Sequence, residues 1–196
     1  MATEFTPFPP LAQLAADLAA GRTTSRALVE TALERIADPA GQGAVAFMHV
    51  DADSARAAAD AHDRLRAAGT VLSPLAGIPV SVKDLFDIEG QPTRAGSIVL
   101  AGAPAAKADA VTVARLKRAG AVIVGRTNMS EFAFSGLGLN PHYGHPLSPY
   151  RRGVEGDERI SGGSSSGAAA SVADGWRVFF AIASYVPIGR PIWTRS

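Results

Sequence analysis

Two short apolar segments, with a helical segment between them, constrain the fold of this chain most strongly. Residues 78–82 (IPVSV) and 121–125 (AVIVG) are short and apolar and are bounded by glycine or proline, as buried parallel strands often are. Residues 111–119 between them have the apolar spacing of a helix. A strand, a helix and a second strand in this order predict an α/β fold with right-handed crossovers.

Three helices are expected before the first of these strands. Residues 11–20 are apolar and favour a helix. Ser25 can cap a second helix that runs to about Ile36, and residues 51–68 are rich in alanine. A glycine follows the first and the third segment, where helices commonly stop. Together these segments predict an N-terminal helical layer that serves as a scaffold or an interaction surface.

The later part of the chain has weaker local signals. Asp109 or Thr112 can cap the helix between the two strands, and a glycine follows that helix as its stop. Residues 129–134 are interpreted as a short helix and residues 136–159 as a loop with several prolines. Residues 168–173 are small and favour the start of a further helix.

Composition excludes several classes of protein. The chain has 196 residues and is 47% hydrophobic, enough apolar surface to bury a core. Its 19 basic and 18 acidic residues nearly cancel, so no charge excess favours nucleic acid or an anionic membrane. It contains 0 cysteines, which rules out disulfide scaffolds, thiolate metal sites and cysteine nucleophiles.

Neither end of the chain resembles a targeting or membrane segment. Residues 1–10 contain no lysine or arginine, so the basic region of a secretory signal is missing. The most apolar stretch, residues 178–188, is interrupted by Pro187 and is shorter than the roughly 20 apolar residues that span a bilayer. We expect a soluble cytoplasmic protein with no membrane partner.

A glycine and serine run at residues 162–167 (GGSSSG) is the first candidate site. Such a run is often a linker, but here a helix start follows it, so its backbone N–H groups could bind an anion or oxyanion. A phosphate-binding loop is excluded because alanine, not lysine, follows the last glycine. The run also fits the G-x-S-x-G pattern, but every histidine precedes it, which argues against an α/β-hydrolase. A dinucleotide fingerprint fails because Pro141 stands where a glycine is required.

With no histidine or cysteine suitably placed, a lysine is the remaining candidate base for a serine. Lys83 directly follows the apolar segment 78–82, where burial could lower its pKa. Two alternatives remain open at this point. Lys83 could be a surface residue paired with Asp84, or it could form a Schiff base with a carbonyl substrate.

Three motifs in order give a much more specific signal than any one of them. They are residues 77–84 (GIPVSVKD), residues 125–132 (GRTNMSEF) and residues 162–167 (GGSSSG). This combination strongly resembles the amidase signature family, which includes bacterial amidases and the glutaminase-type chain of tRNA-dependent amidotransferases. The resemblance covers about residues 74–175, and it implies an α/β/α domain with a mixed sheet, of which this chain would hold the N-terminal part.

The resemblance also implies a mechanism and a set of site residues. Members of the family hydrolyse amides through a Ser–cis-Ser–Lys triad, without a cofactor or metal. Lys83 matches the triad lysine, and Ser164 matches the bridging serine whose peptide bond is cis. Ser165 matches a position that can hydrogen-bond the lysine amine. Met129 is expected near the pocket wall, with core packing as the alternative.

Two further glycines, Gly162 and Gly163, are expected to contact the substrate, a small amide. The nucleophile is not found. In the family it lies in a Gly-Gly-Ser turn about two dozen residues after the bridging serine. Here Ser184 is the only serine in that area, and no glycine turn surrounds it. Residues 1–175 are therefore expected to be the front of the family domain and residues 176–196 a divergent tail of a truncated, inactive copy.

Other readings belong to different classes of protein. The chain could be a non-catalytic remnant or binding module that keeps the front half of the fold, and an incomplete fold would expose sheet edges and favour self-association. A metal-binding module that uses His142 and His145 is a third reading, although no cysteine is available to complete the ligand set.

Overall fold

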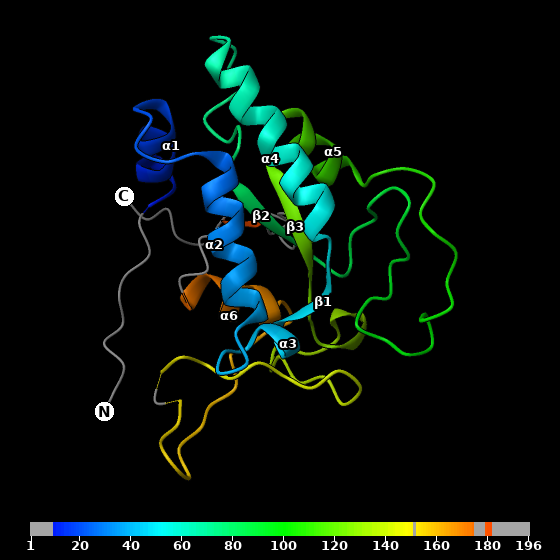
Figure 1. Cartoon of the computed structure of the whole chain (residues 1–196). Helices are drawn as coiled ribbons and strands as arrows, with labels where there is room; N and C mark the ends of the chain where they lie inside the picture. Colours follow the sequence, from blue (N-terminus) through cyan, green and yellow to red (C-terminus); the bar gives the residue numbers. More distant parts are fainter. Residues whose placement is uncertain (1–9, 151, 175–178, 182–196) are drawn as a thin grey trace, which may run out of the picture.

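The computed structural model describes residues 10–150, 152–174 and 179–181, and a mixed β-sheet lies at its centre (Figure 1). The strand order is β1-β3-β2-β4. β1 pairs with β3 antiparallel, whereas β2 is parallel to both β3 and β4. The strands are β1 (Phe47–Val50), β2 (Pro79–Lys83), β3 (Val122–Thr127) and β4 (Phe179–Ala181). The expected mixed sheet is confirmed.

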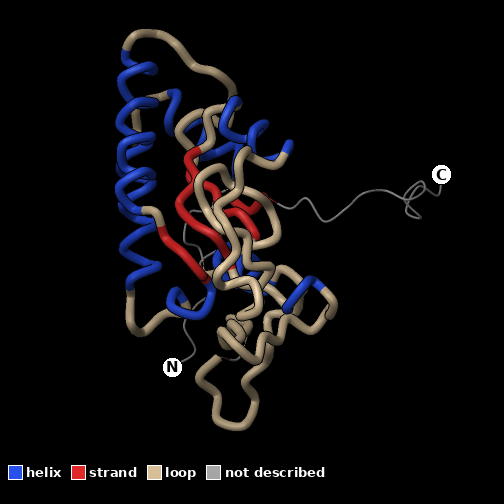
Figure 2. Tube along the Cα trace, turned by 90° about the vertical axis from the view of Figure 1, so that its right-hand side faces the viewer, coloured by secondary structure: helices blue, strands red, loops and turns tan. Residues whose placement is uncertain are grey.

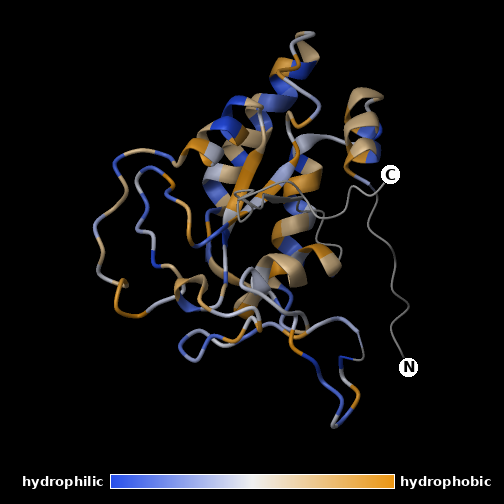
Figure 3. Ribbon diagram, turned by 180° about the vertical axis from the view of Figure 1, so that it is seen from behind, coloured by the Kyte–Doolittle hydropathy of each residue, from blue (hydrophilic) through white to orange (hydrophobic). Residues whose placement is uncertain are grey.

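Helices cover both faces of this sheet. The α-helices are α1 (Leu11–Ala19), α2 (Ser25–Ala37), α3 (Gly43–Ala46), α4 (Ala52–Ala67), α5 (Val111–Arg118) and α6 (Ser166–Ala173). One core cluster joins α2, α4 and α6 to Val122 and Val124 of β3, and another joins α5 to Val82 of β2. Figure 2 shows helices along one side of the strands and long loops on the other. Figure 3 shows apolar residues concentrated in the strands and in the helices beside them. The expected α/β/α layering is therefore confirmed.

The N-terminal helices lie where their patterns indicated, but the cap of α2 differs. Thr24, not Ser25, is the N-cap: its side chain accepts a hydrogen bond from the Ala27 N–H at 3.0 Å. The hydroxyl of Ser25 is buried and donates to the Gly77 carbonyl at 2.7 Å. Ser25 therefore ties α2 to the segment that enters β2, which a capping preference alone does not reveal.

The expected cap of α5 is also wrong. Ala110 occupies the N-cap position, with no side-chain hydrogen bond. Asp109 instead accepts the Glu89 N–H at 2.8 Å and the Lys117 ammonium at 2.7 Å. This carboxylate fastens the loop before α5 to the loop that follows β2, so long-range contacts take the place of a local cap.

Two other local expectations need correction. The short helix expected at 129–134 is only a 3-10 turn, Glu131–Ala133, because Phe132 and Ala133 have positive φ angles of 51° and 57°. Two short elements, α3 and β1, have no recognisable pattern in the sequence. Each has four residues, too few to show a period. β1 is the antiparallel strand that makes the sheet mixed.

A register shift between β2 and β3 decides which side chains share a face. The pairing passes over Val124, so that Arg126 lies opposite Val82 and Thr127 lies opposite Lys83. Such a bulge re-aims the residues that follow it. Because neighbouring strand residues point to opposite faces, Arg126 lies on the α5 face and Lys83 on the other.

The tail expected to diverge, residues 176–196, falls mostly outside the described residues, and so does Ser184. Residues 179–181 of it form β4. Of the helices that the structure describes, none has both the length and the apolar character needed to cross a membrane.

Replacing Thr24 with alanine should lower the free energy of unfolding by about 1 kcal/mol, because α2 loses its N-terminal cap. Thr23→Ala is the matched control, since the neighbouring Thr23 is not the cap residue. Urea denaturation of both variants measures the difference. Equal losses in the two variants would contradict the assignment of Thr24 as the cap.

Candidate active site

Lys83 and Ser164 meet at the carboxyl end of β2. β2 ends at Lys83, and the glycine and serine run before α6 carries Ser164. The Nζ of Lys83 donates a hydrogen bond to the Oγ of Ser164 at 2.7 Å. Lys83 is only 1% exposed, whereas Ser164 is half-buried and therefore reachable. The structure thus joins a buried amine to an accessible hydroxyl.

The surroundings of Lys83 favour its neutral form. Burial lowers the pKa of Lys83 below the ordinary value of a lysine. The alternative of a surface lysine paired with Asp84 is wrong, because Asp84 forms a buried ion pair with Arg126 at 2.7 Å. Within the described residues no carboxylate forms an ion pair with Lys83. An amine with a lowered pKa can act as a base near neutral pH.

The backbone around Ser164 is held by the second motif. The Ser130 N–H donates to the Ser164 carbonyl at 2.9 Å, and the Gly167 N–H donates to the Asn128 carbonyl at 3.0 Å. These two bonds pair the motif that follows β3 with the start of α6. The three motifs of the sequence therefore converge: one supplies Lys83, one supplies Ser164, and one positions the loop.

The two glycines expected at the substrate lie immediately before Ser164. The Gly163–Ser164 peptide bond is cis, as the resemblance implied. The Gly163 N–H donates to the Gly136 carbonyl at 2.9 Å, and Gly162 has a φ of +76° with open space around it. Contact of Gly162 and Gly163 with a substrate stays a prediction.

Two asparagines that sequence reasoning did not single out brace this loop system. The side-chain amide of Asn128 donates to the carbonyls of Val45 and Gly144, each at 2.9 Å. The buried Asn140 amide donates to the Met129 carbonyl at 2.8 Å. Asn128 belongs to the second motif, so the sequence did mark this position as one to consider. Asn140 lies in the proline-rich loop, where nothing in the sequence marks it.

Met129 immediately precedes Ser130, whose N–H donates to the Ser164 carbonyl, and Ser165 immediately follows Ser164. Met129 is fully buried, and the side chain of Asn140 holds its carbonyl. Ser165 occupies the N-cap position of α6, without a side-chain capping bond. Among the described residues the Lys83 amine bonds to Ser164 rather than to Ser165. The roles expected of Met129 and Ser165 stay predictions.

The metal-binding alternative finds no support in the described residues. His142 lies 3.3 Å from a carboxylate oxygen of Glu131. No group of three histidine or acidic side chains in the described ranges could hold a metal ion.

Comparisons with known proteins identify relatives of this arrangement. A family model for Amidase matches residues 27–185. The chain is 49% identical over 159 residues to the 1-carboxybiuret hydrolase subunit AtzE of Pseudomonas sp. (strain ADP). The match covers 81% of this chain and 33% of that relative. This chain is 43% identical over 162 residues to the GatA-type chain of the glutamyl-tRNA(Gln) amidotransferase of Thermobifida fusca (strain YX), covering 83% of this chain and 31% of that relative.

A solved structure agrees with the sequence relatives. The native peptide amidase from Stenotrophomonas maltophilia superposes with a TM-score of 0.70 at 37% identity, covering 83% of this chain and 33% of the amidase. The chain thus spans about a third of the length of the relatives it matches.

Adding a methyl group at Gly167 should disrupt the loop that carries Ser164. A Cβ built there would collide with the Ala46 carbonyl oxygen and lie 2.6 Å from the Asn128 nitrogen. We expect Gly167→Ala to lower the free energy of unfolding by about 1–3 kcal/mol. Gly102→Ala is the control because nothing lies within 4 Å of its Cβ. If both variants unfold alike in urea, the close packing at Gly167 is refuted.

The stability of the protein should depend on the titration of Lys83. In the unfolded chain this lysine keeps its proton up to about pH 10.5, whereas the folded chain releases the proton at a lower pH because burial lowers the pKa. The unfolded state therefore binds more protons in that window, and the free energy of unfolding should rise with pH there. Lys83→Met should remove this rise. Urea denaturation at several pH values measures it, and parallel profiles for the two proteins would contradict it.

Proposed function

The chain belongs to the amidase family, whose members hydrolyse amide bonds, and we propose that Lys83 and Ser164 supply the proton-transfer part of that reaction. The observation that carries the proposal is the 2.7 Å hydrogen bond between a buried amine and an accessible hydroxyl. A small carboxamide is the proposed substrate class. In this role Met129, Gly162 and Gly163 would line the substrate side, and Ser165 would steady the amine.

The proposed chemistry moves one proton along two residues. Neutral Lys83 accepts the hydroxyl proton of Ser164 as Ser164 accepts a proton from the attacking nucleophile. The nucleophile then bonds to the amide carbon, and the relay returns a proton to the leaving nitrogen when the C–N bond breaks. The lowered pKa of Lys83 supports this role, since a protonated amine could not accept the first proton.

Residues 165–196 do not contain the Gly-Gly-Ser turn that carries the nucleophilic serine in the family. No Gly-Gly-Ser sequence occurs there. We therefore propose that residues 1–196 alone do not turn over amides. A non-catalytic binding module remains the alternative reading of the same absence.

A chimera tests the proton relay separately from the missing nucleophile. Residues 27–174 of this chain would replace the matching segment of AtzE, which is 49% identical to this chain. We expect the chimera to hydrolyse the amide substrate of that relative. Lys83→Ala and Ser164→Ala should each lower kcat by about 10²–10⁴, the usual contribution of a positioned acid or base.

Two controls make the result decisive. Lys107→Ala removes an exposed lysine, and Ser161→Ala removes a serine just before the glycine pair; both should leave kcat nearly unchanged. If Lys83→Ala retained full kcat in an active chimera, the relay would be refuted. Ammonia release by residues 1–196 alone that was lost in Lys83→Ala would overturn only the proposed inactivity.

A further inference from the structure

The outer edge of β1 is open in the part of the chain that the structure describes. β1 stands at the end of the strand order β1-β3-β2-β4, so β3 is its one neighbour there. Apart from the pairing with β3, no described residue forms a hydrogen bond with Met48, His49 or Val50. The backbone N–H and C=O groups of such an edge can pair with another extended segment.

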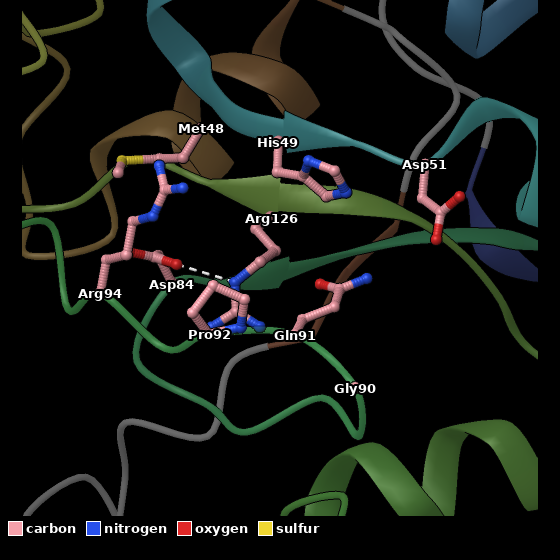
Figure 4. Close-up of a pocket in the computed structure, with 9 residues that line it drawn as sticks. All are labelled: Met48, His49, Asp51, Asp84, Gly90, Gln91, Pro92, Arg94 and Arg126. Carbon is pink, nitrogen blue, oxygen red and sulfur yellow. Dashed lines mark hydrogen bonds and ion pairs between the residues drawn. The ribbon is translucent and has the colours of Figure 1, made fainter. Parts of the chain in front are cut away.

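A hollow lies on each face of this edge strand. The first, of about 340 Å³, is on the α5 face and has Arg126 in its lining (Figure 4). The second, of about 650 Å³, is on the opposite face, between β1 and the second half of α2. Met48 and His49 line both hollows, so β1 runs between them. Side chains of a strand paired with β1 would point alternately to the two faces and would enter the two hollows in turn.

The hollow on the α2 face suits an apolar side chain. Val50 and Ala52 are half-buried and line it together with the buried Leu33. Glu34, an exposed residue of the same lining, forms no ion pair in the described ranges. An acidic side chain in this hollow would be repelled by Glu34, whereas an apolar one gains burial.

The hollow on the α5 face suits a carboxylate. Arg94 is half-buried in its lining and forms no ion pair with any described carboxylate. The Asp84 carboxylate is already paired with Arg126 at 2.7 Å. Asp51 caps α4 and lies at the far end of the hollow from Arg94 in Figure 4, whereas Met48 of the edge strand lies at the same end as Arg94. That end is therefore positively charged.

We propose that an extended segment of an acidic partner polypeptide pairs with the outer edge of β1. Its backbone bonds to β1, its apolar side chains enter the hollow on the α2 face, and the acidic side chains that alternate with them reach Arg94. A second copy of this chain fits less well, because Phe47–Val50 contains no acidic residue to meet Arg94.

Calorimetric titration of the whole chain with capped pentapeptides tests the proposal. One peptide alternates valine with glutamate, and its charge-reversed counterpart alternates valine with lysine. We expect saturable binding of the glutamate peptide, with the lysine peptide weaker by about tenfold or more. An absence of saturation, or equal binding of the two peptides, would overturn the proposal.

N-methylation of the glutamate peptide tests the strand pairing itself. Alternate N–H groups of a strand point to the same side, so one set of alternate amides faces β1 and the other faces away. We expect methylation of one set to abolish binding and methylation of the other set to preserve it. Binding by both methylated peptides, or by neither, would overturn pairing along this edge.

Variants of Arg94 locate the acidic side chains of the bound segment. Arg94→Glu should reverse the preference, so that the lysine peptide binds more tightly than the glutamate peptide by about tenfold. Arg118→Glu is the matched control, because it makes the same change of charge at an exposed arginine of α5 and should leave the preference unchanged. The same reversal in both variants would refute the site.

Sedimentation of the chain without peptide tests the second copy as occupant. We expect no dimer that the glutamate peptide dissociates. Such a dimer would assign the edge to a second copy and would overturn the proposed partner. The amidase proposal can fail without altering any of these affinities, since the outer edge of β1 lies apart from the Lys83–Ser164 pair.

Discussion

The ion pair between Asp84 and Arg126 determines the chemistry on both faces of the sheet. It holds the carboxylate next in sequence to Lys83 on the far side, where Arg126 and the Gly96 N–H occupy both of its oxygens. Lys83 is left with a neutral serine as its hydrogen-bond partner, so burial acts on the amine without a compensating negative charge. If Asp84 paired with Lys83 instead, the amine would stay protonated and Ser164 would have no base.

The position of Ser164 depends on contacts that are distant in sequence. Lys83 and Ser164 are separated by 81 residues, and the segment after β3 joins them through the Ser130 N–H. Gly167 allows the start of α6 to approach the Ala46 carbonyl and the Asn128 backbone closely. The hydrogen-bonded pair is therefore a product of the packed core, and changes at Gly167 act on the site through the fold.

Sequence reasoning recovered the elements with a clear local pattern. The strands around residues 78–82 and 121–125 and helices α1, α2 and α4 formed where expected, since short apolar runs bounded by glycine or proline, helix-favouring stretches and helical apolar spacing indicate such elements. The predicted caps at Ser25 and Asp109 were wrong, because both side chains form hydrogen bonds with residues distant in the sequence. The pairing of Lys83 with Ser164 came from the family motifs, as periodicity carries no information on which loops meet. The pocket beside Arg126 had no signal at all.

One extra residue in β3 separates the buried basic side chains of Arg126 and Lys83. Without the bulge at Val124 the register would place Arg126 opposite Lys83, on the same face, and the guanidinium would oppose protonation of the amine by direct repulsion while leaving Asp84 unpaired. With the bulge, Arg126 turns to the α5 face and Thr127 takes the place beside Lys83. Arg126 forms its ion pair with Asp84 on that face, whereas burial lowers the pKa of Lys83, which has a serine hydroxyl as its partner. A single irregularity of the sheet thus places two buried basic side chains on opposite faces, one beside a carboxylate and one beside a hydroxyl.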